Sequence, residues 1–289
     1  MAKSKAGGTR AYIRGKIGAD VYSIGKDGKG RKQQVVRSLA EQVKNPQTTA
    51  QMRGRMIMST IMQVVAQGSF LFDHSFDNVP TGQPSISEFI RKNYALIKTD
   101  VAAHEASGNS FGLNKYQEKG AHAGAYQISA GAAVISSNWA VAIDGSEFGN
   151  LGALSNTAKA FRDAAGLGVD DYVTFVYIDQ SKVLHYARVR IDFTTISDAT
   201  VITSSNIANL FSIESDITLS VTISGNLITF ATTDPYVAAC GIILSKKVGA
   251  SYEHNDAVMT VDSAPDYTAS VALPTYPTGS ERFLNGGDI

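Results

Sequence analysis

Residues 217–230 read ITLSVTISGNLITF, and this stretch decides the class of fold that we predict for the second half of the chain. Apolar and polar residues alternate on both sides of Ser224-Gly225-Asn226, as they do in β-strands with one buried face. Gly225 can adopt the positive φ of a tight turn, so the stretch predicts a β-hairpin. Other strand-like runs lie around it, at residues 171–178, 183–193, 236–246 and 256–261.

Strands separated by turn signals in this way predict an antiparallel β-sandwich or barrel-like (Ig-like) domain over residues 150–273. One helix is inserted in it, since residues 156–165 have a helical pattern and end at Gly166, a typical helix terminator. Residues 274–289 are rich in Pro and Gly and are expected to form an extended tail.

Residues 45–105 predict an antiparallel helix pair. Pro46 disfavours helix at Asn45, and Thr48 or Thr49 can cap the helix that follows. Apolar residues then recur at helical spacing until about Gly68: Met52, Met56, Ile57, Ile61, Val64 and Val65. The second helix begins with the capping box Ser85-Ile86-Ser87-Glu88 and has a buried stripe of Ile86, Phe89, Ile90 and Ile97.

Two further segments complete an α+β chain. Residues 106–149 are rich in Ala and Gly and are interpreted as an irregular connecting segment with short strands, one of them at Tyr126-Gln127-Ile128-Ser129. Residues 1–44 are interpreted as a basic β-hairpin or arm, with strand-like runs at 11–18, 20–24 and 33–39. The glycine-rich residues 25–30 lack the Walker spacing and a following helix, so they predict a turn rather than a phosphate site.

The charge of the chain is divided unevenly. The whole sequence has 26 basic and 26 acidic residues, yet residues 1–55 hold 13 basic residues against three acidic ones. This segment therefore carries +10 and the remainder −10. The asymmetry favours docking of the basic segment onto an acidic neighbouring surface, with a solvated basic hairpin or nucleic-acid contact as alternatives.

Composition excludes several classes of protein. Only 18% of residues are charged, and a neutral, weakly charged chain is more typical of an assembly than of a free enzyme. The one cysteine, Cys240, excludes an intramolecular disulfide framework and a multi-cysteine zinc site. The basic N-terminus has no apolar run typical of a secretory signal, and we expect no membrane insertion.

No pattern of catalytic residues is present, and we predict a protein that is not an enzyme and needs no metal or cofactor. Asp170-Asp171 precedes a strand, where aspartates commonly form turns, and Cys240 lies in an apolar run. The histidines have no metal-ligand spacing: His74, His104, His122, His185 and His254.

Four short segments, in their order along the chain, resemble an uncharacterised family found in Bacteroidetes genomes and in crAss-like phages of the gut. They are Lys44-Asn45-Pro46-x-Thr48-x-x-Gln51 leading into Arg53 and Arg55, Tyr126-Gln127-Ile128-Ser129-x-Gly131, the run GLGVDDYVTFV at 166–176, and GIILSKK at 241–247. Relatives continue the last segment with a Trp and an Arg-Ser pair, whereas this chain has Tyr252-Glu253-His254-Asn255.

The resemblance implies a virion component, a ring protein of the short tail barrel. It implies a twelve-fold homo-oligomeric ring that contacts neighbouring tail-ring or portal-proximal proteins and encloses a lumen through which DNA or cargo protein passes. The chain would be made in the host cytoplasm and reside in the virion tail.

From the charge pattern we expect the neighbour-docking interface to include Arg10, Arg14, Lys16, Lys26, Lys29, Arg31, Lys32, Met52, Arg53, Arg55 and Met56. A head-decoration or receptor-binding adhesin, and a DNA-contacting packaging or ejection protein, are the alternative functions.

Overall fold

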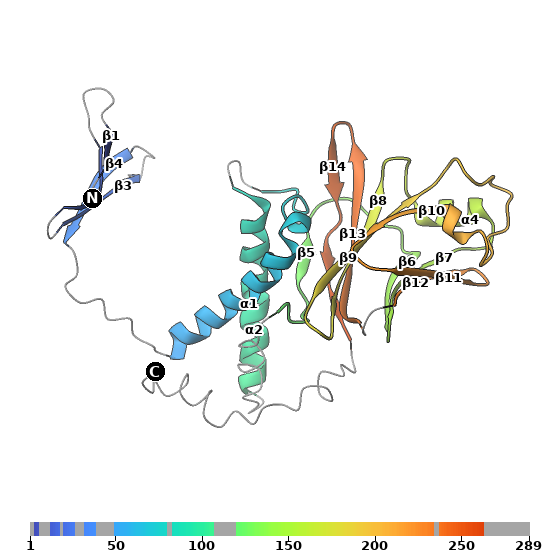
Figure 1. Cartoon of the computed structure of the whole chain (residues 1–289), viewed down its shortest axis with the longest axis horizontal. Helices are drawn as coiled ribbons and strands as arrows, with labels where there is room; N and C mark the ends of the chain where they lie inside the picture. Colours follow the sequence, from blue (N-terminus) through green and yellow to red (C-terminus); the bar gives the residue numbers. More distant parts are fainter. Residues whose placement is uncertain are drawn as a thin grey trace. The chain divides into compact units, whose positions relative to one another are not determined.

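The structure is a computed structural model, and it describes residues 3–5, 12–17, 20–26, 32–38, 49–79, 83–106, 120–233 and 237–262 (Figure 1). The chain divides into two compact units, Met1–Gln47 (unit 1) and Thr48–Ile289 (unit 2). Helices and mostly antiparallel sheets occur together, which confirms the predicted α+β class.

Unit 1 contains a four-stranded antiparallel sheet in which the strands follow their order along the chain. The strands are β1 (Lys3–Lys5), β2 (Tyr12–Ile17), β3 (Asp20–Lys26) and β4 (Lys32–Ser38). Three of them coincide with the predicted runs, and β1 adds a strand to the predicted hairpin. None of the unit 1 side chains whose exposure the structure describes is buried.

Unit 2 begins with helices α1 (Thr49–Phe72) and α2 (Ser85–Ala106), which pack against each other and run in broadly opposite directions (Figure 1). The predicted end at Gly68 is a kink, where the backbone leaves helical values (φ −117°, ψ 16°) before the helix resumes to Phe72. A Cβ at Gly68 would lie 2.6 Å from the Phe72 ring, so this position suits glycine. Phe72 stacks on Phe89 of α2 with ring centroids 4.2 Å apart, which joins the two helices.

Two larger sheets make up the rest of unit 2. The first has the strand order β10-β9-β8-β13-β14, with β16 also pairing with β13, and the second has the order β11-β12-β7-β6. The strands of the first sheet are β8 (Tyr172–Asp179), β9 (Leu184–Ile191), β10 (Phe211–Ser215), β13 (Val237–Val248), β14 (Ser251–His254) and β16 (Thr260–Val261). Those of the second are β6 (Trp139–Asp144), β7 (Glu147–Gly152), β11 (Leu219–Ser224) and β12 (Leu227–Thr232), and the last two form the predicted hairpin.

The first sheet lies between the helix pair and the second sheet (Figure 1). Val176 and Ile178 of β8 pack in the core that includes α1 and α2. Phe175 and Tyr177 of the same strand pack in the core shared with the second sheet, where Phe175 contacts Phe230 with ring centroids 5.1 Å apart. A strand covered on both faces needs a nearly continuous apolar run, which explains the sequence YVTFVYI.

The predicted connecting segment contributes ordered structure. The hairpin β6–β7 belongs to the second sheet, and β7 spans the boundary predicted at residues 149–150. A small two-stranded sheet of β5 (Gln127–Ser129) and β15 (Ala257–Val258) lies beside α2. Between β9 and β10 the chain forms a short 3-10 helix, η1 (Ile207–Leu210).

The inserted helix is α4 (Ala158–Ala165), close to its predicted bounds. Thr157 caps its first turn by accepting a hydrogen bond from the Ala160 N–H, and Gly166 ends it in the left-handed conformation (φ 65°). Both positions match the residue types that favour helix termini.

Candidate interaction surfaces

The residues predicted at the interface are divided between the two units. Four lie on the unit 1 sheet: Arg14 and Lys16 on β2, Lys26 on β3 and Lys32 on β4. Three lie outside the described residues: Arg10, Lys29 and Arg31. The other four lie near the start of α1 in unit 2: Met52, Arg53, Arg55 and Met56. The predicted set therefore does not form one surface within a unit.

Strand β4 presents an exposed surface. Every side chain from residue 33 to 38 is exposed, and Val35 and Val36 are 37% and 51% exposed. The strand is also the last of its sheet among the described residues, so one of its edges faces no neighbouring strand there. Exposed apolar side chains on an edge strand are a typical feature of surfaces that pair with another chain.

The outward side of the helix pair is partly apolar. Arg55 is exposed, as are Met58 and Met62, one helical turn apart on α1. Tyr94 and Leu96 of α2 are exposed to a similar extent. Methionine side chains adapt to different partners, so this side of α1 can pack against another protein surface.

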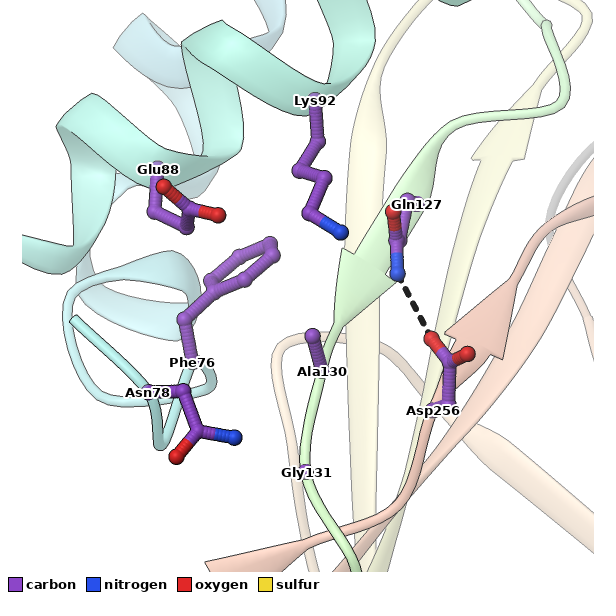
Figure 2. Close-up of a pocket in the computed structure, with 8 residues that line it drawn as sticks. All are labelled: Phe76, Asn78, Glu88, Lys92, Gln127, Ala130, Gly131 and Asp256. Carbon is purple, nitrogen blue, oxygen red and sulfur yellow. Dashed lines mark hydrogen bonds between the residues drawn. The ribbon is translucent and has the colours of Figure 1, made fainter.

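A polar pocket of about 190 Å³ lies between α2, β5 and the loop after α1 (Figure 2). It is lined by Phe76, Asn78, Glu88, Lys92, Gln127, Ala130, Gly131 and Asp256. The Gln127 side chain donates a hydrogen bond to Asp256 Oδ1 at 2.6 Å, and Lys92 extends towards the same side chain (Figure 2).

The acidic group on the helix side of this pocket is held ionised. Glu88, which is predicted to close a capping box, pairs with Arg91, and this hydrogen bond lowers the pKa of the Glu88 carboxyl. A carboxylate with a lowered pKa is a poor general acid at neutral pH. The pocket can hold a small polar molecule.

Buried side chains beside the pocket join distant segments of unit 2. The Asn93 side chain of α2 donates to the Gln127 carbonyl at 2.9 Å and accepts from the Gln127 N–H at 2.8 Å, which anchors β5 to the helix. The Ser129 hydroxyl donates to the Asn255 carbonyl at 2.7 Å, and Asn255 Oδ1 accepts from the Leu244 N–H at 2.8 Å. These hydrogen bonds hold α2, β5 and the segment after β14 together.

His254, at the end of β14, bonds to the loop after α1. His254 Nδ1 is 2.6 Å from Asp77 Oδ1, and the His254 N–H donates to Asp77 Oδ2 at 2.7 Å. At Gly131, a Cβ would collide with both Asp77 Oδ2 and the His254 carbonyl oxygen. Gly131 and the end of β14 therefore both lie against the loop after α1.

The neighbouring carboxylates Asp170 and Asp171 also have structural partners. Asp171 is buried and accepts hydrogen bonds from the Gly168 N–H at 2.8 Å and the Lys247 N–H at 2.7 Å. Asp170 pairs with the Lys247 ammonium at 2.8 Å, which lowers the pKa of the Asp170 carboxyl. Each aspartate therefore ties the start of β8 to the end of β13.

An arginine–tyrosine cluster, which the sequence pattern did not single out, lies on the first sheet beyond the helix pair. The guanidinium carbons of Arg188 and Arg190 on β9 are 4.6 and 5.1 Å from the ring centroid of Tyr172. Tyr252 of β14 contacts the same ring with centroids 5.4 Å apart. Arginine and tyrosine are enriched where proteins bind one another. The sequence held one signal for this cluster. Arg188 and Arg190 are two residues apart in a predicted strand, which places both side chains on one face of the sheet.

Cys240 and His185, two side chains of types used in catalysis, are respectively buried and paired with carboxylates. Cys240 is buried, and burial raises the pKa of its thiol, so the thiolate nucleophile is disfavoured. His185 lies between Asp179 (Nε2–Oδ2, 3.4 Å) and Asp216 (Nδ1–Oδ2, 3.1 Å), and these carboxylates raise the pKa of its imidazole. Within the described part of the chain, His, Cys, Asp and Glu side chains form no group suited to a metal ion.

No protein-family model, curated protein or solved structure matches the chain. None of the helices in the described ranges combines the length and apolar character needed to cross a membrane.

Proposed function

We propose that this chain is a structural virion protein, a subunit of a ring in the short tail of a crAss-like bacteriophage. The observation that carries the proposal is the unit 1 sheet, in which no side chain of described exposure is buried. Small isolated sheets that bury little apolar surface are marginal in water, so a partner surface would stabilise this sheet. Neighbouring subunits of a ring provide one.

The uneven charge distribution indicates which surfaces of two neighbouring subunits meet in this contact. Residues 1–47 contain eleven basic and three acidic residues, whereas the chain after residue 55 has a net charge of −10. Subunits in a closed ring meet through two different surfaces, and a basic unit followed by an acidic one supplies both. Exposed ion pairs contribute only about 0–1 kcal/mol each, so apolar groups such as Val36, Met58 and Met62 must supply most of the affinity.

For the two sheets of unit 2 we propose an Ig-like sandwich of the variable type. The strand order β11-β12-β7-β6 corresponds to D-E-B-A of that topology, and β10-β9-β8-β13-β14 corresponds to C″-C′-C-F-G. The helix α4 is then an insertion between strands B and C. Phe175 occupies the strand of the usual core tryptophan, and the sole cysteine leaves no inter-sheet disulfide.

The native mass of the full-length chain tests the functional proposal. We expect a large homo-oligomer at physiological salt that dissociates as the salt concentration rises, because screening weakens contacts between exposed charges. A full-length chain that stays monomeric at micromolar concentration would overturn the proposal. Ring-shaped particles in negative-stain images would support it directly.

Charge reversal on unit 1 tests the orientation of the contact. Lys16 and Arg37 are exposed, and replacing both with Glu is expected to weaken association by about tenfold, the effect of about 1.4 kcal/mol. The matched control replaces the exposed Lys98 and Lys246 of unit 2 with Glu. Equal weakening by both pairs would show that net charge, rather than the unit 1 surface, controls association.

The proposed Ig-like sandwich favours a second function. An Ig-like sandwich is common among cell-surface and adhesion modules, which supports a head-decoration or receptor-binding protein. That function predicts a monomer or elongated trimer with affinity for capsids or glycans. The native mass distinguishes it from a ring.

A further inference from the structure

The two edges of the unit 1 sheet differ in their chemistry. The edge strand β1 carries Lys3 and Lys5, and lysine on an edge strand opposes pairing with another chain. The opposite edge strand, β4, has a basic residue near each end but an uncharged centre, Gln33-Gln34-Val35-Val36. Of the two outer strands among the described residues, β4 is therefore the one better suited to pairing with a further strand.

The backbone of β4 can accept such a strand. The strand is seven residues long, and within the described residues only β3 pairs with it. In an antiparallel pair, alternate residues direct their N–H and C=O groups away from the partner strand. Those outward groups and the exposed Val35 and Val36 together form a site for addition of an extended segment.

The chain contains one segment that matches this edge in length, charge and composition. Residues 266–273 read DYTASVAL, an eight-residue run between Pro265 and Pro274 that contains Tyr, Thr and Val, residues favoured in strands. Its single charged residue is Asp266. The region from 263 to 289 has three acidic residues and one basic residue, opposite in sign to unit 1.

We propose that residues 266–273 of a neighbouring copy add as a fifth strand along β4, on the side opposite β3. This inference rests on the proposed ring function, because each copy donates the segment to one neighbour and receives it from the other. Such an exchange is heterologous and repeats around a closed ring. It also extends the one sheet of the chain that has no buried side chain of described exposure.

Cysteine cross-linking between separate chains tests the contact. Cys240 is buried, so the unmodified chain provides a background of low reactivity. One full-length variant carries Val35→Cys and the other Ser270→Cys, at the centres of the two segments, so that either strand direction brings the thiols near each other. The two variants, with tags of different size, are mixed under dissociating salt, reassembled, and treated with a short bismaleimide.

We expect a cross-linked species that contains one copy of each variant, at least tenfold more abundant than the product of a matched control mixture. The control replaces Val35→Cys with Lys3→Cys on the lysine-bearing edge. A synthetic peptide of residues 264–275 should reduce the cross-link in proportion to its concentration. Val36→Cys serves as the second variant if Val35→Cys does not fold.

Native mass, measured on the same samples, separates failure of the contact from failure of the ring. A large oligomer without the heterologous cross-link overturns the strand addition and leaves the ring function standing. Cross-linking only within single chains, seen in a Val35→Cys/Ser270→Cys double variant, also overturns the neighbour contact. A monomeric chain that gives no cross-link overturns both.

Discussion

The sheet of unit 1 and the first sheet of unit 2 are both antiparallel, yet their stability has different sources. In unit 2, the strands β8 and β13 are covered on one face by helices and on the other by the second sheet. In unit 1, β4 is exposed along its described side chains. Backbone pairing between strands is enough to form a sheet. Whether that sheet is stable without a partner depends on how much of its two faces is buried.

The largest effect is expected from removing a side chain at the centre of unit 2. Phe175→Ala deletes a fully buried ring that contacts Trp139, Phe148 and Phe230, and should destabilise the protein by about 3–5 kcal/mol. Chemical denaturation followed by tryptophan fluorescence measures the loss, because Trp139 lies in the same core. Val36→Ala on β4 is the control and should change the free energy of unfolding by less than about 0.5 kcal/mol. Similar losses from both would contradict the comparison.

A buried charge in unit 2 should have the next largest effect. The Arg162 guanidinium of α4 donates to Asp198 Oδ1 at 2.5 Å and to the carbonyls of Asp192 and Ile196 at 3.0 and 2.6 Å. Arg162→Ala leaves these acceptors without a donor and should cost about 3 kcal/mol in unfolding free energy. The exposed Lys159 of the same helix, replaced by Ala, should cost less than about 0.5 kcal/mol. A small loss at Arg162 would mean that water replaces its hydrogen bonds.

A smaller loss is expected where α2 meets β5. Asn93→Ala removes the bonds to both backbone groups of Gln127 and should destabilise unit 2 by about 1–3 kcal/mol. Hydrogen exchange at the Gln127 amide should accelerate more than exchange within β8. Thr99→Ala, on an exposed position of the same helix, controls for changes in helix propensity. Unchanged exchange at Gln127 would show that packing alone holds β5.

The smallest expected effect is a pH dependence of the free energy of unfolding that arises from His185. Asp179 and Asp216 raise the pKa of this imidazole in the folded state, so its stabilising contribution is present below the unfolded pKa of about 6.5. The contribution is lost as pH rises through the raised folded pKa, and it amounts to less than about 1 kcal/mol because the pair is partly solvated. His185→Gln should therefore destabilise the protein more at pH 5.5 than at pH 8. The opposite order would show that the imidazole is neutral when paired.

Local sequence patterns predicted the elements in which buried and exposed residues recur at regular spacing along the chain. The hairpin β11–β12 and the helix α4 follow from alternation, a threonine cap and a terminal glycine, all local features. The hairpin β6–β7 has a weak local pattern, and only its pairing with β12 places it in a sheet. Arg188 and Arg190 likewise gain Tyr172 as a neighbour through strand pairing. Contacts between distant segments of this kind have no signature in a single sequence.

The end of the described chain has a mechanical consequence. Only two residue pairs hold β16 to β13, Ala239 with Val261 and Cys240 with Thr260, supplemented by the bond from the Asp262 N–H to the Ala238 carbonyl. A tensile load applied to the chain after Asp262 would break the Val261 pair first and the Thr260 pair next, so β16 would separate from β13 one residue pair at a time. Strands β8 and β13 would remain joined, since their long ladder lies behind this short one.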